Sequence, residues 1–163
     1  MILGLEQYVI LGAGLDTFCF RHPELVNRLE IFEVDHPATQ KFKIKRIANA
    51  GLKVPNHLHF VPMDFTKKFS YQTLINNRFD VNKKTFFSLL GVSFYLTTEE
   101  NSSLFKHIFA NVPSGSSIVF DYADDTLFKE KGMSNRVENM VKMDSASGEA
   151  MKSSFTNYEI QTM

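Results

Sequence analysis

Residues 8–16, Tyr-Val-Ile-Leu-Gly-Ala-Gly-Leu-Asp, decide the fold of this chain. Their apolar run ends abruptly in Gly12-Ala13-Gly14, as a buried strand does when it breaks into a glycine turn. Because glycine has no side chain, the backbone of such a turn approaches a ligand closely. A second apolar segment, residues 31–35, ends in Asp35, at a spacing where a strand-end carboxylate reaches ribose hydroxyls. The two segments together predict a site for a nucleoside-containing cofactor.

The composition fits a single domain with a substantial core, since the chain has 163 residues and 44% of them are hydrophobic. Eighteen basic residues balance eighteen acidic ones, so the charge gives no support to a nucleic-acid or anionic-membrane partner. The single Cys19 forms no internal disulfide, which favours a reduced, cytoplasmic setting. Residues 1–6 carry no basic segment and no long apolar run, so neither a signal peptide nor a transmembrane helix is predicted.

Short apolar runs alternate with longer amphipathic ones along most of the chain. A helix is predicted over residues 37–50, with Gly51 ending it, and a second helix opens at the capping box of Thr97 and Glu100. This alternation is typical of an α/β fold, in which helices cover both faces of a parallel sheet and ligands bind at the carboxyl ends of the strands. The predicted strands are residues 8–11, 30–34, 57–61, 85–90 and 117–121.

The pattern changes after Tyr122. Residues 123–157 are polar and contain one helically spaced apolar set, Val137, Met140 and Val141, which predicts packing or a substrate lid. The first strand starts almost at the first residue, and no strand follows the last predicted element. We therefore expect residues 1–163 to form one domain with an insertion or lid at 123–157, and to be a piece of a longer protein.

The same residues resemble a known family. Residues 9–17 and 32–40 look like motifs of the leucine carboxyl methyltransferase-like family of S-adenosylmethionine-dependent O-methyltransferases. This family includes protein-phosphatase carboxyl methyltransferases and bacterial polyketide O-methyltransferases. The resemblance implies a Rossmann-like class I methyltransferase fold, truncated at both ends. Further matches follow in the expected order at residues 61–65, 90–96, 118–122 and 148–149.

The resemblance also implies which residues bind the cofactor. The glycine turn would line the methionine moiety, Asp35 would bind the ribose hydroxyls, and Asp64 with Phe65 would contact the adenine. Gly91 would form the wall near the sulfonium, where the family's preceding Glu is Leu90 in this chain. The full set implied is Gly12, Ala13, Gly14, Asp35, Asp64, Phe65, Leu90 and Gly91.

Several of these residues have a structural interpretation as well. The glycine turn suits any strand-to-helix connection. Asp35 suits the N-cap of the helix that begins at Pro37, and Asp64 suits the N-cap of a helix after Phe65. Glu33 shares a strand face with Asp35 but lies further from the ligand end, which favours a structural role.

Other side chains give weaker signals. Tyr95 is the one catalytic candidate, with ring packing as the alternative, and Asp121 ends the last predicted strand at the ligand edge. His57 and His59 are predicted to share one strand face and to be structural, since no further metal ligand accompanies them. Nothing in the sequence suggests a base beside Cys19, so this residue is predicted to be a small buried one.

The reaction implied is transfer of a methyl group to a carboxylate or acidic hydroxyl of a small molecule or peptide, because no dedicated base is visible. Leu90 motivates an alternative, a truncated or degenerate cofactor-binding domain without activity. A nicotinamide-dependent oxidoreductase is less favoured, because the third glycine of the dinucleotide fingerprint would fall at Thr17.

Overall fold

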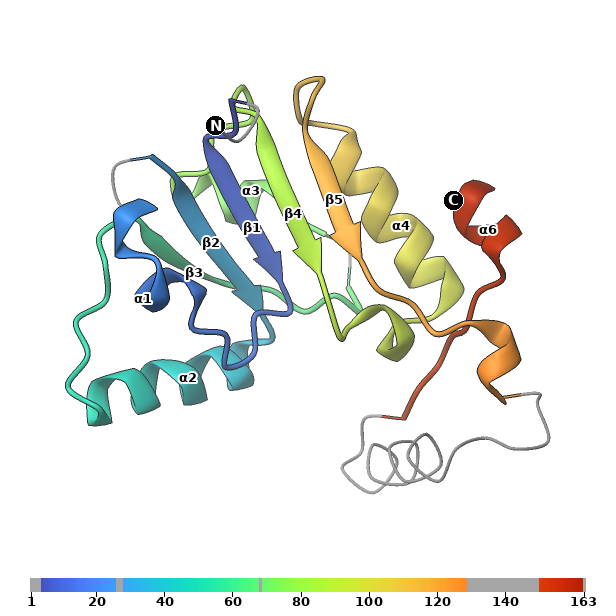
Figure 1. The fold of residues 1–163 in the computed structure, drawn as a ribbon, viewed down its shortest axis with the longest axis horizontal. Helices are drawn as coiled ribbons and strands as arrows, with labels where there is room; N and C mark the ends of the chain where they lie inside the picture. Colours follow the sequence, from blue (N-terminus) through green and yellow to red (C-terminus); the bar gives the residue numbers. More distant parts are fainter. Residues whose placement is uncertain (1–3, 26–27, 68, 129–149, 163) are drawn as a thin grey trace.

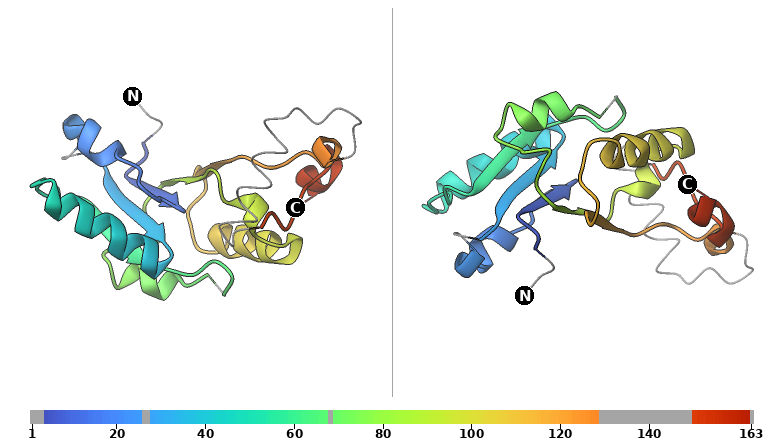
Figure 2. Two further views of the ribbon diagram at one scale, coloured as in Figure 1. Left: turned by 90° about the horizontal axis from the view of Figure 1, so that it is seen from below. Right: turned by 90° about the horizontal axis from the view of Figure 1, so that it is seen from above.

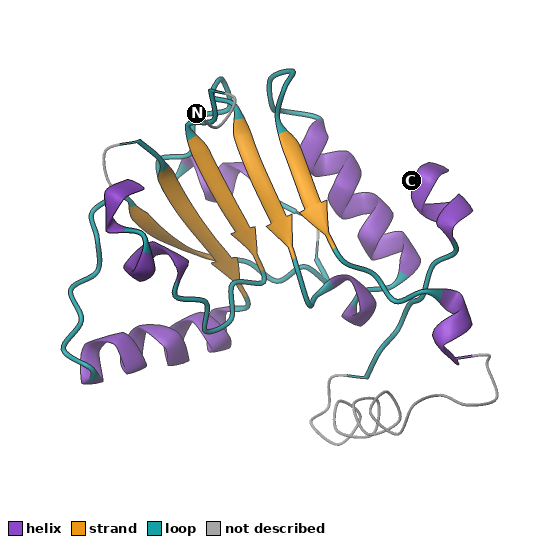
Figure 3. Ribbon diagram, in the orientation of Figure 1, coloured by secondary structure: helices purple, strands orange, loops and turns teal. Residues whose placement is uncertain are grey.

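Five parallel strands form one sheet in the order β3-β2-β1-β4-β5, and their arrows all point the same way in Figure 3. The structure is a computed structural model that describes residues 4–25, 28–67, 69–128 and 150–162. Each strand lies within one residue of its predicted ends, which confirms the α/β prediction. The strands are β1 (Gln7–Leu11), β2 (Glu30–Asp35), β3 (Leu58–Pro62), β4 (Thr85–Leu89) and β5 (Ser117–Phe120).

Helices connect successive strands, as Figure 1 shows. The predicted capping box is confirmed, since Thr97 Oγ1 accepts from the Glu100 amide and the Glu100 carboxylate accepts from the Thr97 amide. Gly51 takes a left-handed φ of +65° just past the second helix, which is also as predicted. The helices are α1 (Phe18–Arg21), α2 (Pro37–Asn49), α3 (Tyr71–Ile75), α4 (Thr98–Phe109) and α6 (Asn157–Thr162), with 3₁₀ turns at Pro23–Leu25, Ser93–Tyr95 and Asp125–Phe128.

The two faces of the sheet bury different kinds of side chain. The larger core cluster joins Phe32, Val34 and Phe87 of the strands to Leu74 of α3 and Ile108 of α4. The smaller cluster, on the opposite face, packs strand residues against Cys19 of α1, and its buried strand residues are Ile10, Ile31 and Leu58. The first face is mainly apolar, with the buried Gln7 and Thr85 at its amino end, whereas the second also holds buried charged groups, described below.

The strand order creates a switch point between β1 and β4. The chain leaves β1 outward to β2 and β3, then crosses back to pair β4 with the other side of β1. In open α/β sheets ligands bind beyond the carboxyl ends of the strands at such a point. The glycine turn after β1 and residues 90–92 after β4 meet there.

The segment beyond β5 is fixed at both of its described ends. The buried Phe155 donates its amide to the Ala123 carbonyl, 2.8 Å away, and forms an isolated bridge with Asp124. In both views of Figure 2, α6 lies at the end of the molecule opposite α2. The apolar set Val137, Met140 and Val141 and the match at residues 148–149 lie outside the described residues. Within the described ranges no helix is long and apolar enough to cross a membrane.

Candidate functional site

The carboxyl edge of the sheet gathers every site residue that the sequence predicts. Because all five strands are parallel, their ends deliver the following segments to one side of the molecule. The glycine turn follows β1, Asp35 ends β2, Asp64 and Phe65 follow β3, Leu90 and Gly91 follow β4, and Asp121 follows β5.

The glycine turn is tightly packed on one side and open on the other. Gly12 has a φ of +71°, and a Cβ added there would lie 2.2 Å from Cγ2 of Val92, in the loop after β4. Gly14 has a φ of +48°, and the nearest atom to its added Cβ is the Gly12 carbonyl at 4.0 Å. Gly12 therefore holds the β1 turn against the β4 loop, while Gly14 presents bare backbone to open space.

The Asp35 carboxylate lies between the glycine turn and the start of α2. One oxygen, Oδ2, accepts from the Gly14 amide, and Oδ1 accepts from the His36 amide at 2.6 Å. The N-cap of α2 is His36, whose Nδ1 accepts from the Ala38 amide at 3.3 Å. The N-cap interpretation of Asp35 is therefore wrong by one residue, because the carboxylate turns toward the glycine turn and away from the first turn of the helix.

Asp64 closes a short turn after β3. Its Oδ1 accepts from both the amide and the hydroxyl of Thr66, at 3.1 and 2.7 Å. The Thr66 hydroxyl bond is the main reason why the pKa of Asp64 lies below its usual value, and Lys67 adds to the effect. No helix begins directly after Phe65, since α3 starts at Tyr71, so the predicted helix-cap alternative for Asp64 is wrong.

Phe65 packs partly against the main core and leaves one side toward a groove of about 390 Å³. This groove lies between the turn after β3 and α4. Its lining combines apolar and charged side chains. Such a lining can pack against a flat ring and hydrogen-bond the ring's polar groups. The remaining lining residues are Thr66, Lys67, Glu99, Glu100, Ser103, Leu104 and His107.

The loop after β4 is held by Asp121. The Gly91 amide donates to both carboxylate oxygens of Asp121, at 2.9 and 3.0 Å, and the Ser93 hydroxyl donates to its backbone carbonyl at 2.5 Å. Gly91 has a φ of +71° and open space where a Cβ would stand, and the Leu90 side chain is 55% exposed. Asp121 thus anchors this loop, and Leu90 and Gly91 face outward at the switch point.

Tyr95 follows in the 3₁₀ turn Ser93–Tyr95. Its ring is half-buried and packs edge-on against Phe94, with 4.7 Å between the ring centroids. The packing interpretation of Tyr95 thus has a structural basis, and its catalytic role stays a prediction.

Beneath the glycine turn lies a buried polar cluster that the sequence did not reveal as such. Glu33 Oε2 and Lys43 Nζ lie 2.5 Å apart, and the Gln40 amide donates to the Glu33 carbonyl at 3.0 Å. Burial raises the pKa of Glu33 to about 6, against the opposing effect of the Lys43 ammonium. The structural role predicted for Glu33 fits its burial, but its partners on α2 were not predicted.

Cys19 and His57 complete this cluster. Cys19 is buried, as predicted, but His57 Nε2 lies 3.4 Å from its Sγ, so a basic side chain stands beside the thiol where the sequence suggested none. Burial raises the pKa of Cys19 to about 11 and lowers that of His57, which leaves both groups neutral at pH 7. The strand begins at Leu58, so His57 lies on the Cys19 side while His59 stacks on Phe32 across the sheet. The prediction that both histidines share one face is therefore wrong.

The described residues contain no group of three or more His, Cys, Asp and Glu side chains placed to hold a metal ion.

Comparison with known sequences points to one family. The leucine carboxyl methyltransferase family matches residues 2–109. A Bacillus subtilis protein, provisionally named as the S-adenosyl-L-methionine-dependent methyltransferase YktD, is 68% identical over 161 residues, which cover 99% of this chain and 53% of that protein. A Mycolicibacterium paratuberculosis protein with a similar provisional name is 31% identical over 123 residues, 76% of this chain and 45% of that protein. The chain thus spans about half the length of these relatives.

Solved structures share the fold at low sequence identity. A DUF574 family protein from Streptomyces avermitilis has a TM-score of 0.71 at 14% identity, covering 98% of this chain and 60% of that one. An O-methyltransferase family protein from Burkholderia thailandensis has a TM-score of 0.61 at 14% identity, covering 96% and 43%. PKMT2 from Rickettsia typhi, solved in complex with AdoHcy, has a TM-score of 0.59 at 14% identity, covering 90% and 26%.

Proposed function

The chain belongs to the leucine carboxyl methyltransferase family, and on that premise we propose that it binds S-adenosylmethionine and acts as an O-methyltransferase. The acceptor we propose is a carboxylate or acidic hydroxyl on a small molecule or peptide. The observation that carries the proposal is the junction of the glycine turn with Asp35 at the switch point, where the Asp35 carboxylate and the Gly14 amide meet.

The residues at this edge fit the cofactor. A ligand with a nucleoside and an amino-acid tail needs backbone that it can approach closely and an acid for its ribose hydroxyls. Gly14 and Gly91 flank the switch point with open space where side chains would stand, and the half-buried Asp35 lies beside them. Phe65 offers an apolar ring at the end of β3, where the adenine is expected.

When bound, S-adenosylmethionine supplies a methyl group on a positively charged sulfur. The chain's own residues would hold and orient this group, with Asp35 accepting hydrogen bonds from the ribose hydroxyls and Asp64 accepting one from the adenine amino group. Holding the reactants in line in a water-poor pocket is the main contribution that a protein makes to such a displacement. An ionised carboxylate acceptor needs no base, which agrees with the lack of a dedicated base among the predicted site residues.

Calorimetric titration of S-adenosylhomocysteine into the chain tests the cofactor site. We expect the wild-type chain to bind, and Asp35→Asn to lower the affinity by about tenfold or more, the value of one charged hydrogen bond. Asp80→Asn is the matched control, because Asp80 caps a turn at the opposite edge of the sheet. Equal affinities for the wild-type and Asp35→Asn chains would contradict the assignment of Asp35.

The acceptor atom requires a separate assay. Incubation with methyl-labelled S-adenosylmethionine and bacterial extract would label the acceptor, and mild alkali would then release labelled methanol from a carboxyl methyl ester. Label that resists alkali on a hydroxyl would point to the acidic-hydroxyl class, and label on nitrogen or carbon would contradict O-methylation.

Leu90 favours a second candidate, a cofactor-binding domain without transfer activity. An exposed leucine replaces the family's carboxylate beside the expected sulfonium, which removes a favourable charge from that position. A chain that binds S-adenosylhomocysteine but transfers no label under any condition would support this candidate.

We also propose a cytoplasmic location, because the one cysteine is a buried free thiol.

A further inference from the structure

A buried ion pair joins α2 to β2 directly below the proposed ribose site. Glu33 and Lys43 are only 1% and 5% exposed at their side chains, and 2.5 Å separates Glu33 Oε2 from Lys43 Nζ. The Gln40 amide, also buried, adds a hydrogen bond from α2 to the Glu33 backbone carbonyl. Two side chains of one helix thus bind a single strand residue, two positions before Asp35.

Stability alone does not explain this pair. Removing two charges from water is offset only when the geometry is good and the remaining polar atoms find hydrogen bonds. Apart from each other, the Glu33 carboxylate and the Lys43 ammonium have no hydrogen-bond partner among the described residues. The neighbouring strand residues on this face include the apolar Ile31 and Leu58. An apolar pair would fill the same space at no such cost.

What an ion pair adds is a fixed relation between two elements. Ile31, Glu33 and Asp35 alternate onto one face of β2, the face that α2 covers. The Asp35 carboxylate accepts from the amide of His36, which caps α2, and from Gly14 in the glycine turn. Any slide of α2 along β2 would therefore move His36 and turn the Asp35 carboxylate away from Gly14.

The charges around the turn support the same role for Lys43. Asp16 and Asp35 lie close enough to Glu33 for their negative charges to disfavour its ionised form, and Lys43 is the cation that opposes them. Without Lys43, three carboxylates would repel one another around the glycine turn.

We propose that Glu33 and Lys43 are positioning residues, which fix α2 on β2 so that the Asp35 carboxylate is held at the glycine turn and aimed at the ribose of the bound cofactor. This inference rests on the proposed function, since it assigns a direction to Asp35 with respect to that cofactor. Neither residue touches the cofactor itself.

The test replaces both charges at once, because a single substitution would leave an unpaired buried charge and strongly destabilise the chain. Glu33→Leu with Lys43→Met fills the space with apolar groups of similar size. The matched control replaces the exposed pair at the opposite edge of the sheet, Glu6→Leu with Lys83→Met, whose charged atoms lie 3.7 Å apart.

Calorimetry measures the affinity for S-adenosylhomocysteine and for its 2′-deoxy analogue. For the Glu33/Lys43 variant we expect unchanged or greater resistance to urea, about tenfold weaker binding of S-adenosylhomocysteine, and a smaller preference for it over the deoxy analogue. A purely structural pair would alter stability and leave this preference intact. Wild-type affinity and wild-type preference in a folded double variant would overturn the proposal.

A ligand-free measurement separates this proposal from the proposed function. The Gly14 amide, which donates to Asp35, is expected to shift upfield and exchange faster in the Glu33/Lys43 variant, with the amides of β1 unchanged. An unchanged Gly14 amide would overturn the positioning role, whether or not the chain binds the cofactor. Failure of the wild-type chain to bind, with the Gly14 amide altered in the variant, would instead count against the proposed function alone.

Discussion

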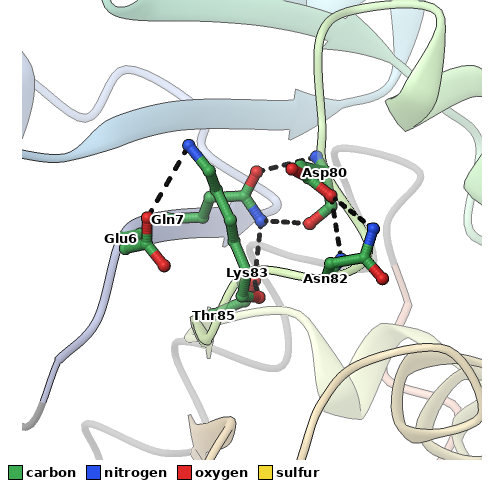
Figure 4. A network of polar contacts seen from close by, with 6 residues as sticks. All are labelled: Glu6, Gln7, Asp80, Asn82, Lys83 and Thr85. Carbon is green, nitrogen blue, oxygen red and sulfur yellow. Dashed lines mark hydrogen bonds and ion pairs between the residues drawn. The ribbon is translucent and has the colours of Figure 1, made fainter.

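Polar groups pair with one another at both edges of the sheet, but the carboxyl edge also leaves backbone open. Figure 4 shows the pairing at the amino edge. The buried Gln7 side chain donates from Nε2 to the Asp80 backbone carbonyl and to Thr85 Oγ1, at 2.8 and 3.0 Å. Its Oε1 accepts from the Asp80 backbone amide at 2.8 Å. At the carboxyl edge Gly14 and Gly91 turn with positive φ into open space. The pairing at the amino edge stabilises the fold, and the open backbone at the carboxyl edge is where we propose that the ligand binds.

Gly12→Ala is expected to have the largest effect on stability, because it disrupts the packing beneath the carboxyl edge. The added Cβ would overlap Cγ2 of Val92, and the φ of +71° is unfavourable for alanine. Overpacking and the left-handed backbone together should lower the free energy of unfolding by about 3 kcal/mol. Urea denaturation of the chain measures this loss.

Gly51→Ala is the matched control for Gly12→Ala. Its φ of +65° is similar, but nothing lies within 4 Å of the added Cβ, so only the backbone term of about 1 kcal/mol is expected. Equal losses at the two glycines would show that the Gly12–Val92 contact does not hold the turn against the β4 loop.

Gln7→Leu tests the amino edge. The substitution leaves the Asp80 amide and carbonyl without their side-chain partner in a buried setting, which should cost about 2 kcal/mol of stability. The affinity for S-adenosylhomocysteine per folded molecule should stay at the wild-type value, because this network lies at the far ends of the strands. A loss of affinity alongside the loss of stability would contradict the assignment of stability to the amino edge and ligand binding to the carboxyl edge.

The sequence predicted what depends on local signals. The strand ends were predicted within one residue, because apolar runs bounded by turn residues identify the strands of a parallel sheet. The capping box at Thr97 and the end of α2 at Gly51 likewise depend on a few adjacent residues. The assembly of the site at one edge then followed from the parallel arrangement alone.

What the sequence did not reveal depends on contacts between distant residues. The buried face of α2 carries Gln40, Lys43 and Ile47, two of which are polar or charged. The apolar Phe42 is exposed. A search for helically spaced apolar residues therefore selects the wrong face of this helix. A glutamate inside a buried strand, Glu33, was the available signal that a buried cation must lie nearby. His57 was assigned to the wrong face because its strand begins one residue later than predicted.

Asp121→Ala has a smaller expected effect, at the carboxyl edge. The substitution removes both acceptors of the Gly91 amide, an exposed interaction that should contribute about 1 kcal/mol to stability. Because the Gly91 loop faces the expected sulfonium, the affinity for S-adenosylhomocysteine should fall as well. Loss of stability with wild-type affinity would mean that Asp121, like Gln7, only stabilises the fold. The β4 loop would then lie outside the ligand site.

Leu90→Glu should have the smallest effect on stability and sharpens the comparison most. Leu90 is largely exposed, so the change should alter the free energy of unfolding by less than about 0.5 kcal/mol. A carboxylate at this position would attract the positive sulfonium of S-adenosylmethionine but gain little from the neutral thioether of S-adenosylhomocysteine. We expect the affinity for the first ligand to rise several-fold relative to the second, an exposed charge contact being worth up to about 1 kcal/mol. Equal changes for both ligands would mean that position 90 does not face the sulfur, and that the loss of the family's carboxylate has no bearing on activity.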